Sequence, residues 1–154
     1  MRSLKSLLMV VVALILVSCS MSAKPEKNET EKVSSAQGEV IVLNKADFLS
    51  KVYNYEKNQT QWVYEGNKPA IIDFYADWCG PCQMMAPVIG QLAGEYEGRV
   101  KIGKLNVDEN PDIAVRYKVM SIPTMIIFRN GEVFSKEVGA SSKKEVEKAI
   151  GRAL

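Results

Sequence analysis

The sequence predicts an α/β domain, because short apolar runs typical of strands alternate with amphipathic segments typical of helices from residue 39 to residue 154. A chain of 154 residues has room for one such domain, and a core of this size buries about two thirds of the surface that the unfolded chain exposes. Only three cysteines occur, Cys19, Cys79 and Cys82. They are too few for a framework of disulfides, so the fold must depend on its hydrophobic core.

The first residues have the pattern of an export signal. Arg2 and Lys5 precede an unbroken apolar run at residues 7–17, which is too short for a bilayer span of about 20 residues and fits the apolar region of a secretory signal. Residues 16–19 (LVSC) resemble the cleavage box of bacterial lipoproteins. That resemblance implies that residues 1–18 are removed and that Cys19 is acylated. The alternatives are an ordinary signal cut after Ser20, an uncleaved anchor and a chance cysteine.

Residues 19–38 are predicted to form a lipidated N-terminus and a flexible tether. They are polar, mixed in charge and almost free of large apolar groups, so burial cannot offset the entropy of ordering them. A coil of about nineteen residues has a typical end-to-end distance of roughly 25 Å, which would keep the domain near its membrane. We expect the protein in the periplasm. Ser20, in place of an aspartate after the cysteine, is similar to the pattern of outer-membrane lipoproteins.

The charge and composition exclude several function classes. The chain has 20 basic and 18 acidic residues, and two of the basic ones lie in the leader. The remainder is therefore neutral and has no basic stripe, which gives no electrostatic reason to expect nucleic-acid binding. The absence of histidine removes Ser-His and Cys-His nucleophile pairs and the ligand that most catalytic zinc sites need. We expect neither a metal nor a cofactor.

The elements of the first half follow from the spacing of apolar residues. A strand is predicted at residues 40–43, and a helix then opens with Asn44 as its N-cap. Residues 54–69 mix polar side chains with aromatic ones, which predicts either a helix extension or a packed loop. The apolar run 70–76 predicts a central strand, and residues 81–97 have the period of a helix.

The second half continues the alternation with a strand at residues 100–107 and a helix at 111–117. Strands at 124–129 and 132–138 flank Asn130-Gly131, a dipeptide that supplies positive φ in tight hairpins. A helix at residues 141–154 closes the domain, with Ser141 or Ser142 as its cap.

The pair Cys79 and Cys82 begins the predicted helix 81–97. Residues three apart on a helix have Cβ atoms about 5–6 Å apart, which can adjust to disulfide range. Unpaired amides and the helix dipole favour an anion at Cys79, so it is the predicted attacking thiolate and Cys82 the resolving thiol. Pro81 fits the first turn, where its missing N–H costs nothing. A structural thiol pair or half of a zinc site are the alternatives.

From about residue 40 to residue 154 the sequence resembles the thioredoxin family. The resemblance rests on the ordered segments 73–82 (DFYADWCGPC), 85–87 (MAP), 104–108 (KLNVD), 121–124 (SIPT) and 138–139 (VG). It implies a thioredoxin fold over residues 39–154, with a mixed four- to five-stranded sheet flanked by helices, and disulfide exchange as the activity. Three departures leave partner choice open. Tyr75 stands where many members carry a second tryptophan, Gln83 stands where lysine is common, and residues 54–69 are longer than in compact members.

Asp73 and Lys104 complete the predicted catalytic set. Asp73 interrupts an apolar strand, and burial without a partner would raise the pKa of its carboxyl. The resemblance implies that this carboxyl takes a proton from Cys82 during resolution, with Lys104 as its electrostatic partner. The alternative is an aspartate on a solvent-facing side of the strand.

The resemblance also implies an apolar rim that receives the substrate. Its predicted members are Trp78, Gly80, Pro81, Ile122, Pro123 and Gly139. The bond between Ile122 and Pro123 is a candidate cis peptide, because proline lowers the cost of the cis form to about 0.5–1 kcal/mol. Trp78 could instead be a core residue. Four methionines are assigned to core or rim packing in preference to a metal site: Met84, Met85, Met120 and Met125.

The dipeptide between the cysteines indicates the direction of electron flow. Gly80-Pro81 is similar to reducing thioredoxins, with potentials of about −270 mV, whereas oxidases and isomerases usually place a histidine there. We therefore expect a monomeric protein-disulfide reductase of the cell envelope that acts on protein disulfides. Export would separate it from cytoplasmic electron donors, so a membrane-embedded thiol donor is expected. The alternatives are an envelope disulfide oxidase or isomerase, and a non-catalytic lipid-anchored binding or holdase module.

Overall fold

The structure is a computed structural model that describes residues 38–60, 63, 67–130 and 132–154. The predicted leader, the acylation site at Cys19 and the tether up to residue 37 lie outside these ranges. So do Trp62 and Tyr64 of the inserted segment, and Gly131 of the hairpin. None of the helices in the described ranges has the length and apolar character needed to cross a bilayer.

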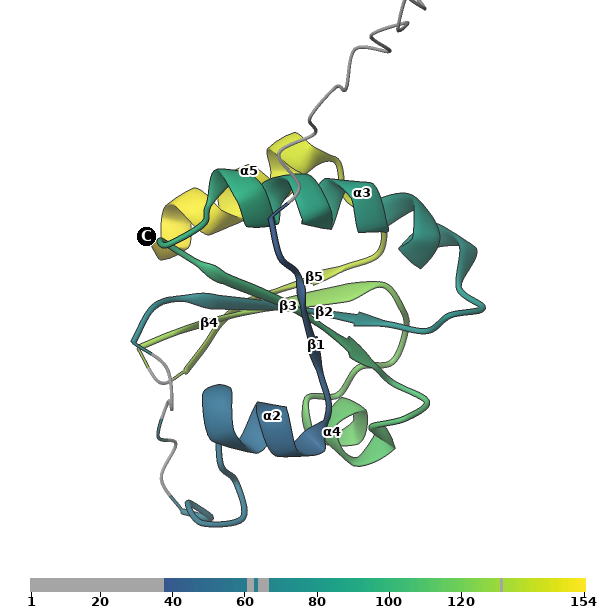
Figure 1. Ribbon diagram of the computed structural model, residues 1–154. Helices are drawn as coiled ribbons and strands as arrows, with labels where there is room; N and C mark the ends of the chain where they lie inside the picture. Colours follow the sequence, from purple (N-terminus) through teal and green to yellow (C-terminus); the bar gives the residue numbers. More distant parts are fainter. Residues whose placement is uncertain (1–37, 61–62, 64–66, 131) are drawn as a thin grey trace, which may run out of the picture. The chain divides into compact units, whose positions relative to one another are not determined.

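A five-stranded mixed sheet lies between two layers of helices (Figure 1). Its order is β1-β3-β2-β4-β5. β1 and β2 both pair in parallel with β3, while β4 pairs antiparallel with β2 and β5. The strands are β1 (Ile41–Leu43), β2 (Ala70–Tyr75), β3 (Lys101–Asn106), β4 (Thr124–Arg129) and β5 (Glu132–Val138). The predicted α/β class and its mixed sheet are confirmed.

Two helices cover each face of the sheet (Figure 1). α3 (Gly80–Glu95) and α5 (Lys143–Ala153) lie on one face, and α2 (Lys45–Lys51) and α4 (Pro111–Arg116) lie on the other. The N-caps predicted for α2 and α5 are confirmed. Asn44 accepts a hydrogen bond from the Asp47 amide at 2.9 Å, and Ser142 forms a capping box that starts α5.

The inserted segment after α2 is a packed loop over its first part, so the helix extension is wrong there. Tyr53 is buried, and its hydroxyl donates to the Asn58 carbonyl at 2.6 Å. The Tyr55 hydroxyl donates to the Asp112 carboxylate at 3.1 Å, which ties the loop to α4. α2 ends at Lys51, and the aromatic side chains after it bond to Asn58 within the loop and to Asp112 of α4.

β2 explains how the sheet divides the core. Both of its faces are buried, as the apolar run predicts for a central strand even though Asp73 interrupts it. Successive side chains alternate between the faces, so Ile71 packs with the residues of α3 and α5, while Ile72 and Phe74 pack with those of α2 and α4. Asp73 follows the parity of Ile71 and therefore faces α3, the helix that carries the cysteines.

Candidate active site

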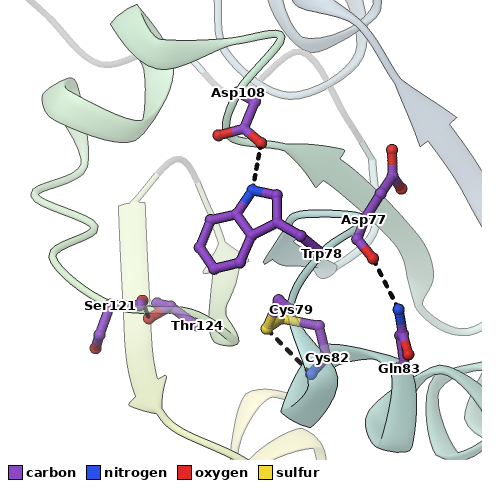
Figure 2. Close-up of a disulfide and its surroundings, with 8 residues drawn as sticks. All are labelled: Asp77, Trp78, Cys79, Cys82, Gln83, Asp108, Ser121 and Thr124. Atoms are coloured by element: carbon purple, nitrogen blue, oxygen red, sulfur yellow. Dashed lines mark hydrogen bonds between the residues drawn. A yellow bond between two sulfur atoms is a disulfide. The ribbon is translucent and has the colours of Figure 1, made fainter.

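Cys79 and Cys82 lie at the N-terminus of α3, where Cys79 is the N-cap residue (Figure 2). A disulfide joins them, with Cα atoms 5.2 Å apart. The Cys82 amide donates to the Cys79 sulfur at 3.2 Å. Each residue is only 4% exposed, so burial does not distinguish the two sulfurs. The hydrogen bond from the Cys82 amide and the position at the helix N-terminus do distinguish them, because both favour negative charge on the Cys79 sulfur.

Asp73 is buried behind this pair, with 4% of its surface exposed. Its Oδ1 atom has no hydrogen-bond partner among the described residues. Burial raises the pKa of the carboxyl to about 6, and the charge of Lys104 opposes that rise. Lys104 lies opposite Asp73 in the register of β2 and β3, and its ammonium lies over the Tyr75 ring, 5.0 Å from the centroid. The alternative of a solvent-facing aspartate is thus excluded.

A crevice of about 390 Å³ brings Asp73 and Cys82 to one cavity. One wall comes from Val40 and Val42 at the start of the domain, and the opposite wall comes from Ala86 and Ile89 of α3. Tyr75, Asp77, Gln83 and Lys104 complete much of the lining. We call this cavity the Asp73 crevice. Its position gives the buried carboxyl and the inner cysteine a common route to solvent.

Several of the predicted rim residues can be placed relative to the disulfide or to one another. Trp78 is 72% exposed, so it is not a core residue, and its indole N–H donates to the Asp108 carboxylate at 2.8 Å (Figure 2). Ile122 packs against the buried cluster formed by Ala76 and the two cysteines, and it precedes Pro123 in a cis peptide, as predicted. The Gly139 amide donates to the Pro123 carbonyl at 2.8 Å, with φ of 93° that favours glycine.

The remaining predicted rim positions open α3. Gly80 and Pro81 lie between the cysteines, and a Cβ atom at Gly80 would meet no other atom within 4 Å.

The methionines divide into two groups. Met85 and Met125 are buried, whereas Met84 and Met120 are exposed. The described residues contain no group of three or more His, Cys, Asp or Glu side chains that could hold a metal ion.

Four polar residues around the site had no role in the sequence prediction. The buried amide of Asn106 donates to the Asp77 carboxylate at 3.3 Å, and its oxygen accepts from the Asp108 amide at 3.0 Å. Gln83 donates to the Asp77 carbonyl at 2.8 Å (Figure 2). These bonds link the turn before α3 to the end of β3. The segment 104–108 carried a resemblance signal, but no local pattern indicated these partners.

Residues 39–152 match the family model described as Thioredoxin. The chain belongs to the thioredoxin family. It is 50% identical to a thioredoxin of Staphylococcus epidermidis over 115 residues, which are 75% of this chain and 98% of that one. It is also 50% identical to a thioredoxin of Chlorobaculum thiosulfatiphilum over 95 residues, 62% of this chain and 88% of the relative.

A further relative, Thioredoxin 2 of Chlorobaculum tepidum, is 47% identical over 95 residues, 62% of this chain and 87% of its own length. As a thioredoxin, the chain is a protein-disulfide reductase. The bonded pair Cys79 and Cys82 has the separation that dithiol exchange requires.

Proposed function

We propose that this thioredoxin reduces protein disulfides in two exchange steps, with Cys79 as nucleophile and Cys82 as resolving thiol. The observation that carries the assignment is the Cys82 amide, which points at the Cys79 sulfur where α3 begins. The Cys79 thiolate attacks one sulfur of the partner's disulfide. That S–S bond breaks, a mixed disulfide forms, and the partner's other sulfur leaves as a thiolate that takes a proton from solvent.

Resolution then needs a second thiolate, and Asp73 is the proposed proton acceptor. Cys82 loses its proton to the carboxylate and attacks the Cys79 sulfur. The S–S bond of the mixed disulfide breaks, the partner's remaining sulfur leaves as a thiolate that takes a proton from solvent, and Asp73 returns its own proton to solvent. The product is the disulfide between Cys79 and Cys82, and the partner gains two electrons and two protons. A carboxyl with a pKa of about 6 is ionised at neutral pH and is a better base than an ordinary aspartate.

The second part of the proposal places this reductase in the bacterial cell envelope. The apolar run 7–17 and the LVSC sequence that ends at Cys19 support an acylated N-terminus after removal of residues 1–18. The protein would then sit on the periplasmic side, held by its lipid, with the outer membrane favoured by Ser20. A membrane-embedded thiol donor would return two electrons to the disulfide.

Anchoring is tested by fractionating cells that express the full chain or its Cys19→Ala variant. Acyl chains contribute about 0.8 kcal/mol per buried methylene, and two or more give stable attachment. We expect the unaltered protein in the membrane fraction with a lipid mass on its N-terminal residue, and the variant outside that fraction. An unaltered protein free of lipid, with an N-terminus after Ser20, would instead identify an ordinary signal.

The equilibrium redox potential of the cysteine pair tests the direction of exchange. A redox potential of about −270 mV supports a reductase, whereas a potential of about −120 mV would make the protein an oxidant. Reduction of insulin with a dithiol donor separates both enzymes from a binding or holdase module, which would not turn over. The absence of histidine near the cysteines supports the reductase, since no imidazolium can stabilise the thiolate form.

A further inference from the structure

Gly38, the last residue of the predicted tether, is packed on α3. Its amide donates a hydrogen bond to the Gly90 carbonyl at 3.1 Å. A Cβ atom at this position would overlap the carbonyl carbon of Ala93 and the backbone nitrogen of Gly94. Any residue larger than glycine must therefore move this segment away from the helix. We call the hydrogen bond and this close packing together the Gly38 contact.

The Gly38 contact connects the two walls of the Asp73 crevice next to the cavity, without lining it. On one side, Gly38 is two residues before Val40, which lines the crevice and packs against the cluster that contains Ile89 and Ala93. On the other side, Gly90 directly follows Ile89, which lines the opposite wall. The contact thus joins the start of the domain to the catalytic helix, next to lining residues of both walls.

We propose that Gly38 is a positioning residue for disulfide exchange, which holds β1 and the residues before it against α3 and so keeps the Asp73 crevice narrow. This role rests on the proposed function, in which Asp73 accepts the Cys82 proton. Gly38 touches neither cysteine and does not line the crevice itself. Its effect would act entirely through the distance between the two walls.

The physical link is the hydration of Asp73. The carboxyl is buried, and its Oδ1 atom has no hydrogen-bond partner among the described residues, so additional water in a wider crevice would stabilise the charged form of the carboxyl and lower its pKa. The charged or titratable groups that face it are Lys104 on β3, Tyr75 and Asp77 at the end of β2, and Cys82 on α3. The crevice wall before and within β1 consists of Val40 and Val42. Displacing this segment changes the hydration of Asp73 and carries one charged side chain with it, the exposed Glu39, which does not line the crevice.

A weaker base takes a proton from Cys82 less readily. Loss of the Gly38 contact should therefore slow resolution more than attack, and it should do so most below the pKa of a free thiol. The rate of attack by Cys79 should change little, because the N-terminus of α3 keeps its dipole and the Cys82 amide that donates to the Cys79 sulfur. This selective effect distinguishes a positioning role from a general loss of stability.

The test uses the full chain with Gly38→Ala. Two quantities are measured: the titration midpoint of the Asp73 carboxyl by NMR, and the rate at which Cys82 resolves a mixed disulfide between Cys79 and a fluorescent peptide thiol, from pH 5 to 9. We expect the midpoint to fall from about 6 towards 3.8, the resolution rate at neutral pH to fall several-fold, and the inflection of the rate profile to follow the midpoint.

Two controls isolate the contact. Glu39→Ala alters the neighbouring exposed residue and should leave both readouts unchanged. Ser142→Ala removes the capping box of α5, none of whose residues lines the crevice, so it should lower stability without shifting the midpoint. A folded Gly38→Ala protein with an unchanged Asp73 midpoint would overturn the proposal.

If Gly38→Ala does not fold, a chain that begins at Glu39 removes the contact without adding a side chain. Its new α-amino group carries a charge near Val40, so the midpoint is measured with that group acetylated. Residues 39–152 span the matched family domain, and 115 residues of this chain align with 98% of the Staphylococcus epidermidis relative. The truncated chain should show the same fall in the midpoint, and an unchanged midpoint would reject the role of Gly38. A separate variant, Asp73→Asn, tests the proposed function. If Asp73→Asn resolves the mixed disulfide at the normal rate, while Gly38→Ala still shifts the Asp73 midpoint, then the proton-transfer role of Asp73 fails and the effect of Gly38 on the crevice stands.

Discussion

The two faces of the sheet are built from different chemistry. On the α2 and α4 face, the Tyr117 ring lies 5.5 Å from Phe48 and 5.4 Å from Phe128, in edge-to-face contacts. On the α3 and α5 face, the core is mainly aliphatic. The Asp73 carboxyl is buried on this face beside the cysteine pair, and its Oδ1 atom has no hydrogen-bond partner in the part of the chain that the structure describes. The aromatic face supplies stability, whereas the aliphatic face gives up some stability to bury a base.

The comparison extends to the surface. Near the aromatic face, Lys45 forms ion pairs with Asp112 at 2.9 Å and with Glu56 at 3.2 Å, which join α2, the inserted loop and α4. Beside the disulfide, the large side chain of Trp78 is exposed, and Met120, two residues before Ile122 in the sequence, is exposed as well. Exposed apolar groups beside a reactive pair suit the docking of partner proteins, whereas the ion pairs place charged groups on the surface near the aromatic face.

Substitution of the cysteines should produce the largest effect and confine it to the aliphatic face. Cys79→Ser should lose disulfide reduction by orders of magnitude, because a hydroxyl is a far weaker nucleophile than a thiolate. Cys82→Ser should accumulate mixed disulfides through Cys79, since attack proceeds and resolution does not. Non-reducing gels with a protein disulfide substrate measure both. Equal trapping by the two variants would contradict the assignment of the nucleophile.

The aromatic face should respond in the opposite manner. Phe128 is fully buried, so Phe128→Ala should lower the free energy of unfolding by about 3–5 kcal/mol. Activity per folded molecule should remain close to that of the unaltered protein. Denaturant titration and insulin reduction measure the two quantities. Phe134→Ala, at a 41% exposed site on β5, is the matched control and should cost much less. If Phe128→Ala instead loses specific activity to the extent that the cysteine variants do, packing on the aromatic face also controls the active site.

Asp73→Asn should separate stability from activity on the aliphatic face itself. The folded pKa is about 6 against an ordinary 3.8, so as pH rises the unfolded chain loses this proton first. Stability therefore falls between about pH 4 and pH 6, and the full cost of about 3 kcal/mol is present above that window. The variant should be more stable than the unaltered protein by about that amount at pH 7 and similar to it near pH 4, yet resolve mixed disulfides more slowly.

Unfolding titrations at several pH values measure this difference. Glu132→Gln, on an exposed part of β5, should show no comparable pH-dependent gain. A variant that is instead less stable at pH 7 would mean that the Asp73 carboxylate is held by favourable bonds, and would contradict the cost assigned to its burial.

The ion pairs beside the aromatic face should give the smallest effect. The Lys45 ammonium lowers the pKa of the Asp112 carboxyl, so their attraction is present at neutral pH and is lost as acid protonates Asp112. Both side chains are about half exposed, and exposed pairs contribute little. Asp112→Asn should lower the unfolding midpoint slightly in low salt and not at all in 1 M salt. An effect as large as that of Phe128→Ala would show that the network holds α4 in place.

The sequence by itself determined the order of the elements, the caps and the redox pair. These depend on signals within a few residues of one another: the period of apolar residues along 70–76 and 81–97, the Asn44 and Ser142 caps, and the three-residue spacing of Cys79 and Cys82. Asp73 was identifiable as a charge in an apolar strand, and resemblance supplied the remaining members of the site.

The tertiary structure decided which residues meet across long separations. Asn106 bridges Asp77 and Asp108, and Gly38 reaches Gly90, more than fifty residues away. Nothing local marks such pairs, because a glycine or an asparagine in isolation is typical of any loop or tether. Only when α3 packs beside β1 does the missing Cβ of Gly38 permit a contact. Only when β2 is covered on both faces does Asp73 lose the water that would otherwise fix its pKa at an ordinary value.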